Sequence, residues 1–533
     1  MSGPARPERR GQRASAPGPA SAAGPQPPPA GGAANKPGRR FEAPAPERWR
    51  RLVQAAAQPC FHGEVSHVSG LLVEASGLPA AIGELVEIVQ RERAPIRAEV
   101  IGFRRDATLL MPHGSADGVA PTQRALALGR PFAVEVSNEL LGRTLDGFGQ
   151  PLDEGPPLAH AQRRSVQAEP PPALSRPPID AALCTGVRAI DGLITLGRGQ
   201  RLGIFAGSGV GKSSLLGQIA RGSDADVIVL GLIGERGREV RGFLDEVLGA
   251  EGQRRAVTVV ATSDRPPIER YTAPFVALTV AEHFRDQGLD VLLVMDSITR
   301  FAAASREIGL AAGEPPGQRG YPPRFFATIP KIVERMGRSA RGSITGLLTV
   351  LLDGDDPNEP VADTLRGLLD GHIYLSRDLA HKGHFPAIDV LQSLSRLMHK
   401  LVPAEQVQLA QALREDLAQW KEGRDLVEIG AYKPGTRPAL DRAMGRLPLI
   451  ELFLKQGLEE RSDLAETLRA LTLVAGELAP PARPAANPGR SPAPKASEAR
   501  PAARPAEPRS PAAPGEPRPA VPSSERRPAE PRR

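Results

Sequence analysis

The chain has 533 residues, of which 40% are apolar and 24% charged, and its formal net charge is +7. Its two cysteines, Cys60 and Cys184, lie far apart without metal-ligand spacing, which excludes a disulfide-stapled secreted fold and predicts reduced thiols in a cytosolic protein. No secretory apolar segment follows Met1 and no 18-residue apolar run occurs, so we expect a soluble chain with at most peripheral membrane contact.

Both ends of the chain are rich in proline, alanine and arginine and lack apolar periodicity. Such segments cannot bury enough apolar surface to offset the entropy of ordering, so we predict that residues 1–46 and 479–533 are disordered. They carry net charges of +5 and +6, which leaves −4 for residues 47–478. The basic character therefore belongs to tails that either keep the protein soluble or contact an acidic surface.

Five segments follow one another between the tails. Residues 47–59 predict a short helix, and the short β-rich runs of residues 60–157 predict a small barrel or sandwich. Residues 158–180 have the composition of a linker. Apolar strand-length runs alternate with helical segments over residues 181–400, which predicts an α/β fold with a parallel sheet covered on both faces. Residues 401–478 predict a small helical domain.

A glycine-rich turn follows the apolar run RLGIFA and precedes a helical segment. Small residues allow consecutive backbone N–H groups to turn onto phosphates, while Lys212 reaches the β- and γ-phosphates and the Ser213 hydroxyl ligates magnesium. Ala206 stands where the strict pattern has glycine, a departure we regard as tolerable. We therefore predict a RecA-like phosphate-loop core that binds ATP and magnesium through Gly207, Ser208, Gly209, Val210, Gly211, Lys212, Ser213 and Ser214.

Three more charged residues follow buried strands. Asp296 ends the apolar run VLLVMD, where an acid orients the magnesium ion and its waters. Glu235 and Arg236 follow the run VIVLGLIG, and a carboxylate at this edge of a sheet can polarise the attacking water. The alternative is that Glu235 and Arg236 are ordinary solvated charges.

Hydrolysis also requires positive charge at the transition state, which an arginine of a neighbouring subunit can supply. Arg366, Arg377 and Arg396 are the candidates beyond the core strands.

Eight segments occur in the order typical of one family. They are GSGVGKS, LIGERGREV, ATSDRPP, EHFRDQGLDVLLVMDSITRFA, REIGLAAGEPPGQRGYPP, GDDPNEPVAD, LLDGHIYLSRDLA and HFPAIDVLQSLSR. Together they resemble the ATPases of bacterial type III protein export, a family similar to the subunits of the rotary ATP synthase. The resemblance covers about residues 60–460 and implies a small N-terminal β-barrel, the ATPase core and a small helical domain.

The resemblance also implies roles for single residues. Lys212 and Ser213 match the phosphate and magnesium residues, and Asp296 matches the aspartate on the magnesium side. Glu235 matches the glutamate that activates water, and Arg236 matches its partner near the γ-phosphate.

Two further positions concern the adenine base of the nucleotide and the assembly of several copies. Arg396 matches the arginine that acts in trans, and Leu351 or a neighbour stands where the synthase's catalytic subunit stacks a tyrosine on adenine. Because one chain carries both Glu235 and Arg396, copies can complement one another around a ring, and we infer a homohexamer.

The resemblance implies a set of partners and a location. These are stator and central-stalk proteins, export substrates with their chaperones, and an export gate at the cytoplasmic face of the inner membrane, with no nucleic acid. The IGAY segment favours the flagellar branch, and the injectisome branch is the alternative. The loop of residues 311–323 either faces the ring centre or is an ordinary surface loop.

Two other classes share parts of this layout. A hexameric RNA translocase would show stacking aromatics on its barrel, yet residues 60–157 hold only Phe61, Phe103, Phe132 and Phe148, without a cluster. A subunit of a rotary ion-pumping ATPase would not need both catalytic halves in one chain.

Overall fold

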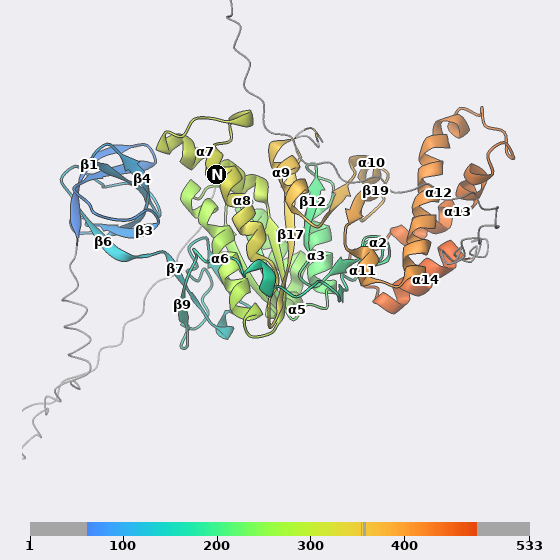
Figure 1. Ribbon diagram of the computed structural model, residues 1–533, viewed down its shortest axis with the longest axis horizontal. Coiled ribbons are helices and arrows are strands. Elements are labelled where there is room, and N and C mark those ends of the chain that lie inside the picture. Colours follow the sequence, from blue (N-terminus) through green and yellow to red (C-terminus); the bar gives the residue numbers. More distant parts are fainter. Residues whose placement is uncertain (1–60, 353, 355, 357–358, 477–533) are drawn as a thin grey trace, which may run out of the picture.

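The computed structural model describes residues 61–352, 354, 356 and 359–476. Three bodies follow one another along the long axis: a small β-barrel, a central α/β body and a helical domain (Figure 1). This arrangement confirms the predicted fold class. The predictions for residues 1–46, 47–59 and 479–533 lie outside the described residues. Within the described ranges, no helix is both long and apolar enough to cross a bilayer.

The barrel closes in the strand order β1-β2-β5-β4-β3-β6. Alternate residues of its strands face inward, and they form a core with Val65, Val73, Val86 and Leu110 fully or almost fully buried. The strands are β1 (His62–Ser69), β2 (Leu72–Ser76), β3 (Glu84–Ile88), β4 (Ile96–Arg104), β5 (Ala107–Pro112) and β6 (Arg124–Pro131).

A connector of short elements leads from the barrel to the central body. It contains β7 (Ala133–Val136), η1 (Asn138–Leu140), β8 (Thr144–Asp146), β9 (Gln162–Ser165) and η2 (Ala173–Ser175). β7 pairs with β9, whereas β8 pairs with a strand of the central sheet. Residues 60–157 therefore do more than build the barrel, because their last strand extends the neighbouring sheet.

The central sheet has the strand order β19-β18-β12-β17-β15-β13-β14-β8, with β16 beside β17. Every neighbouring pair from β18 to β8 is parallel, and β19 at the edge is antiparallel to β18. The strands are β12 (Arg201–Ala206), β13 (Val227–Ile233), β14 (Ala256–Ala261), β15 (Asp290–Asp296), β16 (Gly337–Arg338), β17 (Ser343–Leu351), β18 (Gly371–Leu375) and β19 (Ile388–Ser395). β10 (Ala182–Leu183) and β11 (Leu196–Gly197) form a separate two-stranded antiparallel sheet.

Helices cover both faces of this sheet, which explains why strands such as β13 are buried along their whole length. Two separate apolar cores lie on the two faces. The elements around them are α2 (Arg188–Leu193), α3 (Lys212–Gly222), α4 (Gly237–Gly242), the π-helix η3 (Phe243–Leu248), α5 (Gly249–Arg254), α6 (Pro267–Arg285), α7 (Ile298–Ala312), η4 (Gln318–Gly320), α8 (Pro323–Arg335), α9 (Pro360–Leu368), α10 (Arg377–His381) and α11 (Met398–Leu401).

The helical domain packs at the end of the central body opposite the barrel (Figure 1). It consists of α12 (Ala404–Glu428), α13 (Pro438–Leu454) and α14 (Leu464–Gly476). Leu413, Ile450, Phe453 and Leu471 are almost fully buried and belong to the same apolar core as α2 and α3. The domain therefore shares a hydrophobic core with the central body.

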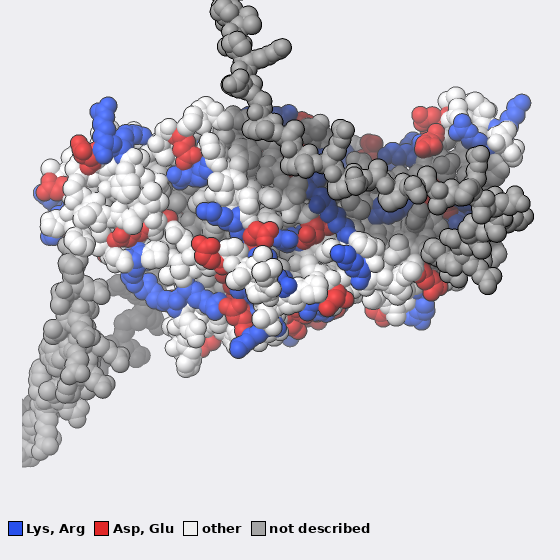
Figure 2. All heavy atoms as spheres, in the orientation of Figure 1, with Lys and Arg blue, Asp and Glu red and all other residues white. Residues whose placement is uncertain are grey.

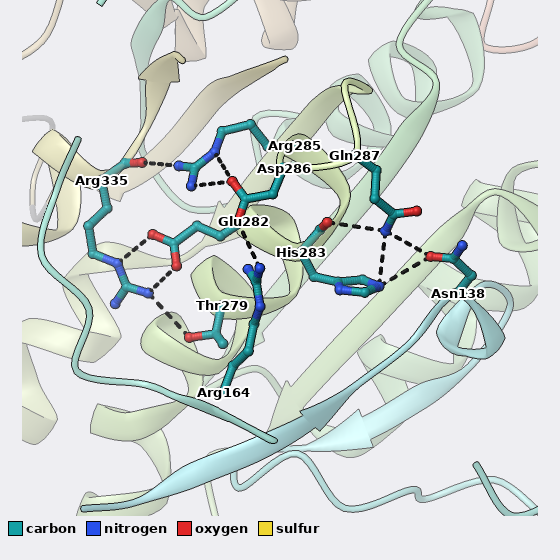
Figure 3. Close-up of polar contacts among 9 residues, drawn as sticks. All are labelled: Asn138, Arg164, Thr279, Glu282, His283, Arg285, Asp286, Gln287 and Arg335. Atoms are coloured by element: carbon teal, nitrogen blue, oxygen red, sulfur yellow. Dashed lines mark hydrogen bonds and ion pairs between the residues drawn. The ribbon is translucent and has the colours of Figure 1, made fainter. Parts of the chain in front are cut away.

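A buried polar network fixes the connector against α6 and α8 (Figure 3). Arg335 is only 2% exposed and makes a bidentate ion pair with Glu282 at 2.8 and 2.7 Å. Its third nitrogen donates to the carbonyl oxygen of Val166 at 2.7 Å, just after β9. Arg164 of β9 binds Asp286 at 2.8 Å. These contacts satisfy buried charge and at the same time hold the connector in place.

We predict that Arg335→Met destabilises the protein strongly, because it leaves the Glu282 carboxylate buried without its partner. Breaking a buried pair in this way costs about 3–5 kcal/mol, which for a folded chain of this size corresponds to a fall of roughly 5 °C in the thermal midpoint. Differential scanning calorimetry measures it, with the exposed Arg341→Met as the matched control. A midpoint no lower than that of the control would contradict the role given to the pair.

Candidate nucleotide site

The phosphate loop lies between the buried end of β12 and the first turn of α3. Gly209 and Gly211 have φ values of +80° and +88°, a region that favours glycine. Val210 is buried and anchors the loop, whereas Ser213 and Ser214 are exposed in the first turn of α3. No side chain caps that turn, so its amide groups are available to an anion.

Lys212 lies at the centre of a cluster of charges behind the loop. Its ammonium group binds the Asp296 carboxylate at the end of β15 and lies 3.6 Å from Oε1 of Glu235. Thr349 of β17 donates its hydroxyl to Asp296 at 2.7 Å. Asp296 is 3% exposed, and a buried carboxylate needs such partners. The structure therefore brings together three residues that the sequence singled out separately.

Glu235 follows β13 and the turn at Gly234, where φ is +69°. Burial and the nearby Asp296 carboxylate raise the pKa of Glu235, and the Lys212 ammonium group opposes this rise. A carboxyl group with a raised pKa is a better proton acceptor than an ordinary surface glutamate.

A cavity of about 250 Å³ opens beside the cluster. Its lining includes Ser213, Glu235, Glu239 and Asp296. These side chains supply hydroxyl and carboxylate oxygens, the ligand type that magnesium prefers. The cavity thus adjoins both the phosphate loop and the acidic residues.

Arg236 lies outside this cavity lining. Its side chain is 67% exposed, and its guanidinium group pairs with Glu239 at 3.5 Å. In the isolated chain the structure therefore places Arg236 at the surface beside the cavity, one residue before α4.

Arg396 lies where the parallel strands of the sheet begin, whereas the phosphate loop lies where they end. Its amide donates to the carbonyl oxygen of Asp370 at 3.0 Å, and the Asp370 amide donates to that of Arg201 at 2.8 Å. Arg201 begins β12, so the loop at the other end of that strand is about 20 Å away along the strand direction. The exposed Arg396 side chain donates to the carbonyl oxygen of Arg366 at 3.1 Å.

The sequence analysis did not identify Phe385, a candidate contact for the nucleotide base. The ring of Phe385, in the loop between α10 and β19, is 46% exposed and lies against the phosphate loop. A Cβ atom placed on Gly211 would lie 3.4 Å from its Cε1. Leu351, the position expected to face adenine, is the last residue of β17. Its backbone amide donates to the hydroxyl oxygen of Thr299 at 2.9 Å. The signal for Phe385 was an aromatic residue before proline in HFPAID, in a chain with 4% aromatics.

A parallel sheet with a phosphate loop, an acid at the end of β15 and a glutamate after β13 defines a phosphate-loop ATPase. Family models agree in all three bodies. Residues 65–129 match the β-barrel domain of the ATP synthase alpha/beta family, residues 186–395 match its nucleotide-binding domain, and residues 402–472 match the "T3SS EscN ATPase C-terminal domain".

Individual relatives show the family more narrowly. The chain is 49% identical over 414 residues to the type 3 secretion system ATPase of Xanthomonas euvesicatoria, covering 78% of this chain and 94% of that protein. It is 47% identical over 417 residues to the flagellum-specific ATP synthase of Bacillus subtilis, covering 78% and 95%. The chain belongs to the family of type III secretion and flagellum-specific ATPases, and it is an ATPase.

Solved structures agree with this assignment. The assembled ATPase EscN of the enteropathogenic E. coli type III secretion system superposes with a TM-score of 0.74 at 45% identity, covering 78% of this chain and all of that one. EscN in complex with its central stalk EscO gives a TM-score of 0.72 at 44% identity, with the same coverage.

We predict that Lys212→Ala weakens binding of magnesium-ADP by at least about tenfold, because charge-assisted contacts to phosphate are lost. Arg396→Ala should leave the same affinity unchanged, since Arg396 lies at the other edge of the sheet. Isothermal titration calorimetry on the dilute, unassembled chain distinguishes the two. Equal losses in both variants would show that Arg396 contributes to the site of its own chain.

Proposed function

We propose that this ATPase energises type III protein export, most specifically export by the bacterial flagellum, by releasing substrates from chaperones and unfolding them at the export gate. The observation that carries the ATPase chemistry is the Lys212–Asp296–Glu235 cluster beside the cavity behind the phosphate loop. The relatives include both flagellar and secretion-system ATPases. The flagellar assignment is supported by the IGAY segment, residues 429–432, and injectisome export is the alternative.

In this proposal the phosphates of ATP lie on the amide groups of residues 207–214, and Lys212 turns from Asp296 toward the β- and γ-phosphates. The Phe385 ring offers an exposed apolar face to the base. The Ser213 hydroxyl and the Asp296 carboxylate would hold magnesium, directly and through water, and their oxygen atoms fit that ion. When bound, magnesium neutralises charge on the phosphates.

Glu235 orients the attacking water and accepts its proton, for which its raised pKa suits it. Arg236 lies next to it at the surface, where it can approach the γ-phosphate when the site closes. Arg396 cannot serve the loop of its own chain, so it stabilises the transition state in the site of a neighbouring copy. A closed ring of six copies gives every site one such arginine.

The same proposal assigns partners and location. A central-stalk protein occupies the ring, and a stator protein holds the N-terminal region. The ring works in the cytoplasm, at the cytoplasmic face of the inner membrane, and requires no nucleic acid. The branch is decided in a strain that lacks the gene: loss of flagellar filaments with intact injection supports the flagellar assignment, and the reverse result contradicts it.

We predict that Glu235→Gln retains nucleotide binding and lowers kcat by at least about 10²-fold, the lower range of general-base contributions. The amide keeps the size of the side chain but cannot accept the proton. Phosphate release and ADP calorimetry measure the two properties, and the exposed Glu251→Gln is the matched control. Turnover equal to that of the control would assign the water-activating role to another residue.

A further inference from the structure

The segment after α13, residues 455–460, joins the helical domain to both ends of the nucleotide site. Gln218 of the phosphate-loop helix α3 donates to the carbonyl oxygens of Gly457 at 3.1 Å and Glu460 at 3.4 Å. Arg221, one turn further along α3, donates to the carbonyl oxygen of Leu458 at 2.7 Å. The helix that begins at the phosphates is thus bound directly to this segment.

Gln456 is the buried centre of the segment, with 5% of its surface exposed. Its Nε2 donates to the carbonyl oxygens of Gly186 at 2.7 Å and Glu460 at 2.9 Å. Its Oε1 accepts from the amide of Arg188, at the start of α2, at 2.9 Å. Arg188 also donates from Nε to the carbonyl oxygen of Phe453 at 3.0 Å. The buried Gln456 amide adds to these contacts the bond to Gly186 and the bond to the Arg188 backbone, and so helps to fix where its own backbone lies.

The backbone of Gln456 is bonded to the loop that contains Phe385, the residue we expect to contact the nucleotide base. The Gln456 amide donates to the carbonyl oxygen of Phe385 at 2.9 Å. Phe385 lies in a loop, and its ring is half exposed beside Gly211. The hydrogen bond from Gln456 therefore ties this loop to the helical domain and limits how far the ring can move from the phosphate loop.

We propose that Gln456 is a positioning residue for the nucleotide base: it holds Phe385 at the distance where its ring meets the base of a nucleotide whose phosphates lie on residues 207–214. This inference rests on the proposed nucleotide site and adds to it a specificity element supplied by the helical domain. It separates the contributions of base and phosphates, because Gln456 is hydrogen-bonded to the backbone of Phe385, whereas none of its hydrogen bonds named above goes to residues 207–214.

The test compares ADP with inorganic pyrophosphate, both with magnesium, by calorimetry on the full chain. Pyrophosphate carries the phosphates but no base. Gln456→Ala should weaken ADP binding about tenfold, within the range that stacking of a base supplies, and leave pyrophosphate binding unchanged. Phe385→Ala should show the same pattern, and the double variant should lose no more than Phe385→Ala alone, because the two residues act as one unit.

Gln411→Ala on the exposed face of α12 is the matched control and should bind both ligands like the parent. Should Gln456→Ala fail to fold, Gln456→Asn retains the amide but is shorter, and we expect a smaller loss confined to ADP. Equal losses for ADP and pyrophosphate, or no loss for ADP, would overturn the inference while leaving the site itself intact. A parent chain that binds neither ligand would instead contradict the proposed nucleotide site.

Discussion

The direction of the strands is the constraint on which the arrangement of this protein depends. Parallel strands end at one edge of their sheet, so the residues that follow β12, β13 and β15 meet there. Lys212, Glu235 and Asp296 form their cluster for this reason, and Thr349 of β17, the strand between β12 and β15, completes it. The charges stabilise one another where each alone would be costly to bury.

The same constraint separates Arg396 from the cluster. Arg396 follows β19, the one antiparallel strand of the main path, and therefore lies where the parallel strands begin. Each copy therefore has its nucleotide site where the parallel strands end and the Arg396 guanidinium group where they begin. A contact between two such different surfaces is head to tail, and head-to-tail contacts form a ring when the rotation between copies closes. The geometry of a single chain thus supports an assembly in which every site is shared. On the face drawn in Figure 2, arginine and lysine side chains lie interspersed with aspartate and glutamate over the central body.

Much of this could be predicted from the sequence. Spacing alone located the phosphate loop, because its chemistry requires small residues and a lysine at fixed positions, and Asp296 was evident as the acid at the end of an apolar run. Phe385 was missed because its position depends on how a loop folds back on the phosphate loop. β8 was grouped with the barrel because three residues carry no signal of which sheet they join. The RNA-translocase hypothesis shared the layout, yet the chain belongs to another family.

The most direct measurement concerns whether a hydrolytic site spans two copies. The full-length Glu235→Gln and Arg396→Ala variants are mixed, and exchange into common rings is verified by energy transfer between labelled chains. If the carboxylate and the guanidinium group come from different copies, about a quarter of the seams in an equal mixture carry both intact groups, and turnover returns although neither parent has it. Mixed rings that remain as inactive as their parents would contradict the account.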